Sequence, residues 1–254
     1  MIRHILSLLI ISAVGVSAAI KRVQVYVALC DNKTQGIAPV GEKIGNGDIP
    51  EANLYWGCTE GLGSFFTKSG KWKLVASEKD TSNTVMRKLT FKHTKEDLEL
   101  TALAYRGSEI RKCIEEFESA SAEGKYDLVA YIGHNGLMDF NLQPPGRTAN
   151  NKTDVIVLCC MSEMYFGPRL RDLGCRTLLM TQQLMYPGSF ILDAALEAWA
   201  HGKTQEAIRT SAGQVYAKNQ GISVKAATGV FAPAHNDAQP VVDGKPPKTP
   251  QPPR

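Results

Sequence analysis

The sequence predicts an α/β protein in which helices cover both faces of a mostly parallel β-sheet. Two observations lead to this prediction. Five short apolar runs have the length and composition of buried strands, and segments with helical periodicity separate them. Nearly continuous apolar strands that alternate with amphipathic helices are typical of parallel sheets buried on both sides. With 254 residues and 43% hydrophobic content, the chain can bury such a core without help from disulfides.

The predicted strands follow one another along the chain in an order that suits a doubly covered sheet. They are Val23–Cys30, Leu100–Tyr105, Tyr126–Gly133, Asp154–Cys159 and Arg176–Thr181. Two earlier segments, Trp72–Ala76 and Val85–Phe91, also have strand character. One arrangement open to Val85–Phe91 is a hairpin with its neighbour. In parallel sheets ligands bind beyond the carboxyl ends of the strands, so those ends are where site residues are expected.

Helical periodicity marks segments between and after these strands. A helix that Ser108 is placed to cap carries one apolar stripe, made of Ile110, Cys113, Ile114 and Phe117. Ser189 and Thr204 are placed to cap two further helices, and Gly221 ends the second. A helix over Leu54–Phe66 is a weaker prediction, because glycines within it disfavour the helical state.

The first 19 residues have the pattern of a secretory signal peptide. Arg3 supplies the positive charge and Ile5–Val16 the apolar run, and small residues predict cleavage after Ala18 or Ala19. The alternative is an uncleaved membrane anchor. The length of the apolar run argues against it, because the run is too short to span a bilayer comfortably. We therefore expect a secreted or periplasmic protein that no longer contacts the membrane once the signal peptide is removed.

The remainder of the chain divides into one domain and a tail. Residues 20–232 hold all the predicted strands and helices and form the expected α/β domain. Residues 233–254 contain seven of the 13 prolines and almost no bulky apolar side chain. Such a composition offers too little apolar area to offset the entropy of ordering, so a disordered tail is expected.

Charge and cysteine content limit the function classes. The net charge is +4 with no basic block, which does not suggest a nucleic-acid-binding protein. Six cysteines are too few for a disulfide-stapled scaffold, and their spacing is not that of a zinc site. They are Cys30, Cys58, Cys113, Cys159, Cys160 and Cys175. Composition does not predict the oligomeric state or the disulfide pairing.

A histidine and a cysteine follow two consecutive predicted strands. His134 comes at the carboxyl end of Tyr126–Gly133, and Cys160 comes at the carboxyl end of Asp154–Cys159. Neighbouring parallel strands lie about 4.8 Å apart, so the two side chains are expected at the same edge of the sheet. An imidazole beside a thiol can take its proton and later protonate a leaving amine. The pattern predicts a Cys-His pair.

The two segments that carry this pair resemble motifs of the caspase-like cysteine peptidases, which include caspases, metacaspases, legumains and gingipains. YIGHNGLMDF (131–140) is similar to the histidine strand and loop of legumains and metacaspases. DVIVLCCMSE (154–163) is similar to the cysteine strand, in which four apolar residues precede a Cys followed by x-Ser. The metacaspase form with two adjacent cysteines uses the second. The motifs themselves cover about 20 residues, and the expected order of strands and helices matches over roughly residues 23–200. The resemblance implies a caspase-like (flavodoxin-like) sandwich.

The resemblance also implies roles for individual residues. Cys160 would be the nucleophile and His134 the general base and acid, with no metal or organic cofactor. Gly136 and the Cys160 amide would hold the oxyanion. The acidic residues near the motifs are weaker candidates for substrate binding. They favour a substrate with a basic or polar residue before the scissile bond. They are Asp31, Asp139 and Glu163.

Three departures from the family pattern leave other functions open. Asn135 separates the histidine from its glycine, Glu163 replaces a glycine, and His134 and Cys160 are only 26 positions apart. One hypothesis is an exported cysteine endopeptidase acting on a peptide or protein substrate. A second is a catalytically inactive binding module with the same fold. A third is a thiol-redox protein that uses Cys159 and Cys160.

Overall fold

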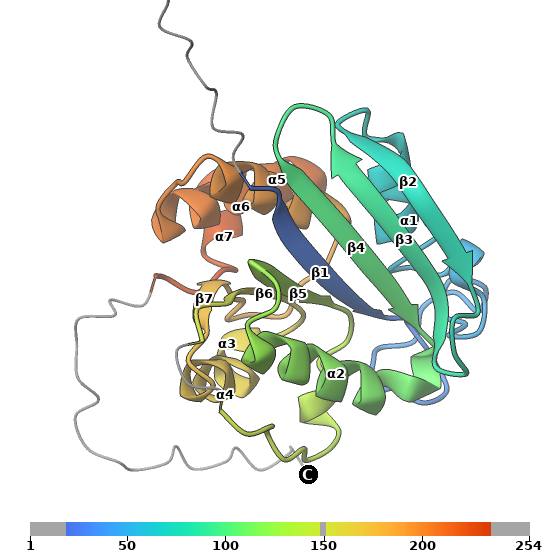
Figure 1. Cartoon of the computed structure of the whole chain (residues 1–254). Helices are drawn as coiled ribbons and strands as arrows, with labels where there is room; N and C mark the ends of the chain where they lie inside the picture. The colour runs from blue at the N-terminus through green and yellow to red at the C-terminus, as the bar shows by residue number, and fades with distance from the viewer. Residues whose placement is uncertain (1–18, 148–150, 235–254) are drawn as a thin grey trace, which may run out of the picture.

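A computed structural model describes residues 19–147 and 151–234, which form an α/β fold around a seven-stranded, mostly parallel sheet (Figure 1). The strand order is β2-β3-β4-β1-β5-β6-β7. The strands are β1 (Lys21–Ala28), β2 (Trp72–Lys79), β3 (Val85–His93), β4 (Leu98–Tyr105), β5 (Leu128–Ile132), β6 (Asp154–Leu158) and β7 (Arg176–Leu179). From β4 to β7 the neighbours are parallel, whereas β3 is antiparallel to both β2 and β4. The hairpin at Val85–Phe91 is thus confirmed.

Seven α-helices and three short 3-10 turns are found in the described part of the chain. The helices are α1 (Leu62–Lys68), α2 (Ile110–Glu123), α3 (Ser162–Tyr165), α4 (Gly167–Asp172), α5 (Ser189–Ala200), α6 (Gln205–Gln220) and α7 (Val224–Thr228). Over these same residues no helix has the length and apolar character needed to cross a membrane. Residues 1–18 of the expected signal peptide and 235–254 of the expected tail lie outside the described residues.

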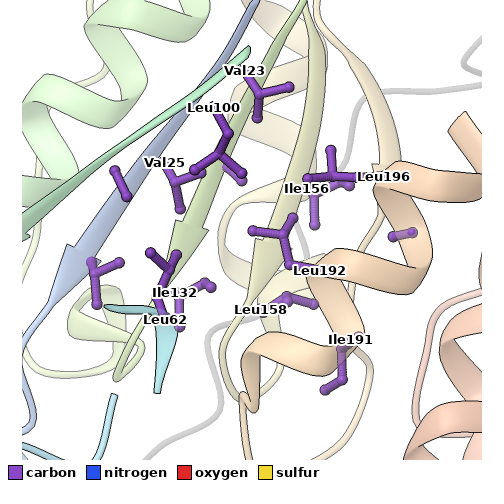
Figure 2. Close-up of a cluster of buried hydrophobic side chains, with 14 of the residues drawn as sticks. Val23, Val25, Leu62, Leu100, Ile132, Ile156, Leu158, Ile191, Leu192 and Leu196 are labelled. Atoms are coloured by element: carbon purple, nitrogen blue, oxygen red, sulfur yellow. The ribbon is translucent and has the colours of Figure 1, made fainter. Parts of the chain in front are cut away.

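The core consists of two hydrophobic clusters. Alternate residues of the central strands belong to alternate clusters. Val23, Val25 and Val27 of β1 belong to the first cluster, whereas Tyr26 and Ala28 belong to the second. Such alternation follows from the period of two in a strand. Helices α1, α5 and α6 contribute to the first cluster, part of which is drawn in Figure 2, and α2 and α4 contribute to the second.

Two sequence-based predictions about helices need correction. The helix expected over Leu54–Phe66 begins only at Leu62, because the preceding chain folds tightly on itself. A Cβ on Gly57 would lie 2.1 Å from the carbonyl oxygen of Glu51, an approach that only glycine allows. Neither expected serine cap forms: Ser108 lies in the 3-10 turn Gly107–Glu109, and Gly188 precedes α5. The Thr204 cap is confirmed by its bond from the Ala207 N–H.

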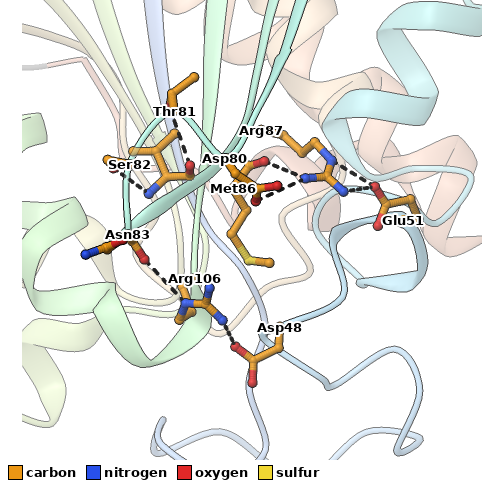
Figure 3. A network of polar contacts seen from close by, with 10 residues as sticks. Asp48, Glu51, Asp80, Thr81, Ser82, Asn83, Met86, Arg87 and Arg106 are labelled. Carbon is orange, nitrogen blue, oxygen red and sulfur yellow. Dashed lines mark hydrogen bonds and ion pairs between the residues drawn. The ribbon is translucent and has the colours of Figure 1, made fainter.

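The long segment between β1 and α1 is anchored to the antiparallel part of the sheet by ion pairs (Figure 3). Arg87 on β3 binds Glu51, and Arg106 after β4 binds Asp48. At its inner side, the fully buried Asn53 bonds both backbone groups of Cys30, at 3.0 and 2.8 Å. These contacts fix the segment against the carboxyl end of β1, next to the ends of β5 and β6.

A buried ion pair joins α2 to α4. Both carboxylate oxygens of the fully buried Glu118 accept hydrogen bonds from the Arg169 guanidinium at 2.7 Å. We predict that Glu118→Ala lowers the free energy of unfolding by about 3 kcal/mol, because it leaves a charged guanidinium without its partner. Urea unfolding measures this loss. Glu123→Ala on the same helix is the control, since its exposed, solvent-screened pair with Lys125 should contribute little to stability. Equal losses in the two variants would contradict the prediction.

Candidate active site

His134 and Cys160 occupy equivalent positions beyond two paired strands. In the parallel register of β5 and β6, Ile132 lies opposite Leu158, and each site residue comes two positions later. Ile132 and Leu158 both belong to the first core cluster, as does Tyr55, which lines the same pocket as His134 and Cys160. This pocket, of about 310 Å³, lies at this edge of the sheet. The structure therefore brings the predicted pair together.

Cys160 lies in a sharp turn between β6 and α3. The next residue, Met161, has φ 54° and ψ 32°, a left-handed conformation that is uncommon and costly for a residue with a side chain. Ser162 and Thr181 hold the turn in place. The Ser162 hydroxyl donates to the Val157 carbonyl at 2.9 Å and accepts from the Thr181 N–H at 2.8 Å. The strand-to-helix turn thereby presents the cysteine at the pocket.

The two adjacent cysteines have different environments. Cys160 is partly exposed, and its Sγ accepts a hydrogen bond from the backbone N–H of Met185 at 3.4 Å. The same sulfur donates to the Met185 carbonyl oxygen at 3.6 Å, so both backbone groups of Met185 hold the thiol at the pocket. Cys159 is fully buried in the second core cluster, and burial raises the pKa of its thiol well above the ordinary value. Of the two, Cys160 alone is placed to react.

The backbone and ring of His134 are both fixed. Its carbonyl oxygen accepts hydrogen bonds from the Tyr131 hydroxyl at 2.7 Å and from the Gly136 N–H at 3.1 Å. Its ring Nε2 lies 2.8 Å from Oδ2 of Asp139. The His134 side chain is only 8% exposed, whereas the side chain of Asp139 is 28% exposed, so the carboxylate reaches the buried ring from the solvent side. With Nε2 engaged, Nδ1 is the ring nitrogen left for a substrate or for the thiol.

Asp139 is itself held by the segment that follows β1. Its Oδ2 accepts a hydrogen bond from the Gly36 N–H at 2.9 Å. A Cβ on Gly36 would lie 2.4 Å from Oδ1 of Asp139, so a larger residue would displace the carboxylate. Asp139 thus links His134 to a loop about a hundred residues earlier in the chain, which is the arrangement of a residue that orients a catalytic base.

Asn135, one of the departures from the family pattern, joins the two halves of the site. Its side chain is fully buried, and its Nδ2 donates to the backbone carbonyl of Cys160 at 2.7 Å. Its Oδ1 accepts from the Leu137 N–H at 3.2 Å and opens the 3-10 turn Gly136–Met138. The extra residue after the histidine therefore holds the turn of Cys160 against the loop of His134.

Three other predicted site residues are not brought to the pocket. Gly136 is buried and does not line the pocket, and its N–H donates to the His134 carbonyl. Asp31 is buried and caps its own turn, with carboxylate bonds from the Lys33 N–H and the Thr34 hydroxyl. Glu163 on α3 pairs with Arg171 on α4 at 2.9 Å. Of the three acidic candidates, only Asp139 contacts the Cys-His pair.

Several residues at the site carry no signal in the sequence. The pocket includes Gly36 and Tyr55 from the segment after β1, and Met185 from the segment after β7. Met185 acts through its backbone, which any residue could supply. Gly36 matters only because Asp139 lies against it. Nothing in their local sequence distinguishes these residues from ordinary loop residues.

A larger pocket of about 730 Å³ lies at the opposite end of the parallel strands. It is lined by the first residues of β1, β6 and β7, which are Lys21, Asp154 and Arg176. The Asp154 carboxylate already accepts bonds from Arg176 and from the Trp199 indole. Because ligands of parallel sheets bind beyond the carboxyl ends, the smaller pocket at Cys160 is the better candidate site.

Among the described residues, no three His, Cys, Asp or Glu side chains are grouped as a metal site would require. All six cysteines are free thiols. Comparison of the chain with protein-family models, with curated proteins and with solved structures finds no match.

Proposed function

We propose that this protein is a cysteine endopeptidase in which Cys160 and His134 form the catalytic pair. The observation that carries the proposal is their placement two residues beyond paired positions of β5 and β6, on the rim of one pocket. The Asp139 carboxylate at 2.8 Å from the His134 ring and the Met185 N–H on the sulfur of Cys160 support such a pair.

The reaction follows from these groups. His134 takes the proton of the Cys160 thiol, and the thiolate attacks the carbonyl carbon of the scissile peptide bond. His134 then returns the proton to the amine as the C–N bond breaks, which leaves a thioester on Cys160. Water, deprotonated by His134, hydrolyses the thioester and restores the thiol. The backbone N–H of Cys160 is the proposed oxyanion donor.

The fold is consistent with a caspase-like sandwich over residues 20–232. Helices α1, α5 and α6 share one core cluster and α2 and α4 share the other, which supports helices on both faces of the sheet. The histidine follows one central strand and the cysteine follows the next, as the resemblance requires. The substrate is a peptide or protein, and the predicted signal peptide makes a secreted or periplasmic location part of the proposal.

The alternatives have less support. A redox couple of Cys159 and Cys160 requires a reactive Cys159, yet this thiol is fully buried and its pKa is raised by burial. A catalytically inactive module was suggested by Asn135 and Glu163. Both residues have local partners that leave the pocket open: Asn135 bonds Cys160, and Glu163 pairs with Arg171.

The proposal is tested by covalent labelling. The purified protein is treated with peptide acyloxymethyl ketones under reducing conditions, and the modified residue is mapped by mass spectrometry. We expect the label on Cys160, with loss of labelling in the His134→Ala variant. A Cys159–Cys160 disulfide in the untreated protein would favour the redox alternative. A folded protein that resists every probe and cleaves no peptide would be the binding module.

Asp139 should act as a positioning residue. We predict that Asp139→Asn lowers kcat by about 100-fold with little change in KM, because the imidazole loses the carboxylate that orients it. Asp139→Glu should restore part of the activity, since it keeps the charge. Asp172→Asn, which changes an exposed carboxylate on α4, is the matched control and should leave both constants unchanged. A rise in KM without a change in kcat would instead assign Asp139 to substrate binding.

A further inference from the structure

The pocket beside Cys160 is apolar, and its lining decides which substrate fits it. Resting on the proposed function, we propose that this pocket receives an uncharged, apolar side chain of the size of Leu, Met or Phe from the residue before the scissile bond. Apart from the Cys-His pair and three small residues, its lining is Ile37, Tyr55, Met138, Leu184, Met185 and Pro187. None of these side chains carries a charge.

Each acidic group that could have matched a basic substrate residue already has a partner. Asp31 is used in its own turn and Glu163 binds Arg171. Asp139 is the nearest, but its carboxylate faces the His134 ring and the Gly36 N–H and does not line the pocket. Burial raises the pKa of Tyr55, so its hydroxyl remains neutral. A Lys or Arg side chain would therefore lose its hydration without gaining a counter-charge.

The rim of the pocket points to the same class of substrate. Leu184 and Met138 both line the pocket, yet they are 72% and 45% exposed in the free protein. Large apolar side chains left in water at the mouth of a pocket gain most when an apolar ligand covers them. The volume of about 310 Å³ is at the lower end of the range for ligand pockets, which suits a single side chain and its backbone.

The pocket gives a quantitative expectation for specificity. One methylene in an apolar pocket discriminates roughly 10- to 200-fold, and an unmatched charge costs more. We expect kcat/KM for a substrate with Leu before the bond to exceed that of the otherwise identical Lys, Arg or Asp substrate by at least about 100-fold. A Gly substrate should also be poor, because it leaves the pocket unfilled.

The test separates this inference from the proposed function. Tripeptide aminocoumarin substrates that differ only in the last residue measure specificity. Iodoacetamide, which has no side chain to fit the pocket, measures Cys160 reactivity in the wild type and in His134→Ala. Fast, His134-dependent alkylation together with a preference for Leu, Met or Phe supports both statements. The same alkylation with a preference for Lys, Arg or Asp keeps the peptidase and overturns the apolar pocket. Absence of both His134-dependent alkylation and cleavage overturns both.

A variant at the rim tests the pocket directly. Leu184→Glu places a carboxylate at the mouth, so the Leu/Lys ratio of kcat/KM should fall by at least about tenfold. Leu74→Glu is the matched control, since Leu74 is an exposed leucine on β2 and does not line the pocket. Iodoacetamide reactivity of Cys160 checks that the site remains folded in both. An unchanged ratio in Leu184→Glu, with normal Cys160 reactivity, would overturn the assignment of this pocket to the residue before the bond.

Discussion

Replacement of Cys160 by alanine should abolish both peptide cleavage and probe labelling, which is the largest effect we expect from any single change. The proposed mechanism forms a covalent bond to this sulfur, and no other group at the pocket can replace it. The variant should remain folded, because Cys160 is partly exposed, the turn is held by its backbone and by Ser162, and the sulfur gives up only its weak contacts with the Met185 backbone. Loss of activity with an unchanged circular-dichroism spectrum is the expected result.

The neighbouring cysteine supplies the matched control. Cys159→Ala removes a sulfur of the same chemistry one position earlier, from the core and not from the pocket. We expect normal labelling of Cys160 and a loss of about 1 kcal/mol in stability from the small cavity, measured by urea unfolding. If Cys160→Ala kept full activity and Cys159→Ala lost it, the nucleophile would be one position earlier than proposed. Because Cys159 lies in the second core cluster and Cys160 lines the pocket, that outcome would contradict the structure.

The strands that carry the site could be predicted from sequence because their signals are local. The runs at β5 and β6 are short and largely apolar, and His134 and Cys160 each come two residues after them. The helix that Thr204 caps and Gly221 ends was predictable for the same reason, since both signals lie within the helix and its flanks. The serine caps expected at Ser108 and Ser189 show the limit of such signals, because the residues at the helix starts are Glu109 and Gly188.

The surroundings of the pair could not be predicted, because long-range contacts determine them. The segment after β1 owes its path to Asn53 on Cys30 and to its ion pairs with Arg87 and Arg106, none of which has a local pattern. Asp139 resembled a solvated loop acid, and only the folded chain puts it against His134. The left-handed Met161 has no glycine or asparagine to signal it.

The acidic residues explain why the sequence alone favours a different substrate preference from the one the pocket supports. Asp31, Asp139 and Glu163 lie near the motifs, and by proximity they favour a basic substrate. In the fold each carboxylate has a partner within the protein, so their charges are not available at the pocket. The apolar lining comes from loops separated by more than a hundred residues, and only the sheet brings these loops together.

Removal of the imidazole should be nearly as damaging as removal of the sulfur. We predict that His134→Ala lowers kcat/KM for peptide substrates by about 10²–10⁴-fold, the usual contribution of a positioned general acid and base. Because His134 is buried but belongs to the pocket wall, the variant should keep its fold. His201→Ala, which removes a half-exposed histidine paired with Glu96, is the control and should have no effect on cleavage.

The type of substrate distinguishes a catalytic His134 from one that only shapes the pocket. The amine that leaves a peptide amide must first be protonated. The thiolate or activated alkoxide that leaves a thioester or an activated ester departs without a proton. His134→Ala should therefore lose far more activity toward the peptide amide than toward the matched ester, and added imidazole should restore part of the amide hydrolysis. Equal losses on both substrates, without rescue by imidazole, would mean that the ring supports the pocket and transfers no proton. The proposed mechanism requires the unequal result, since it assigns to His134 the proton that the departing amine receives.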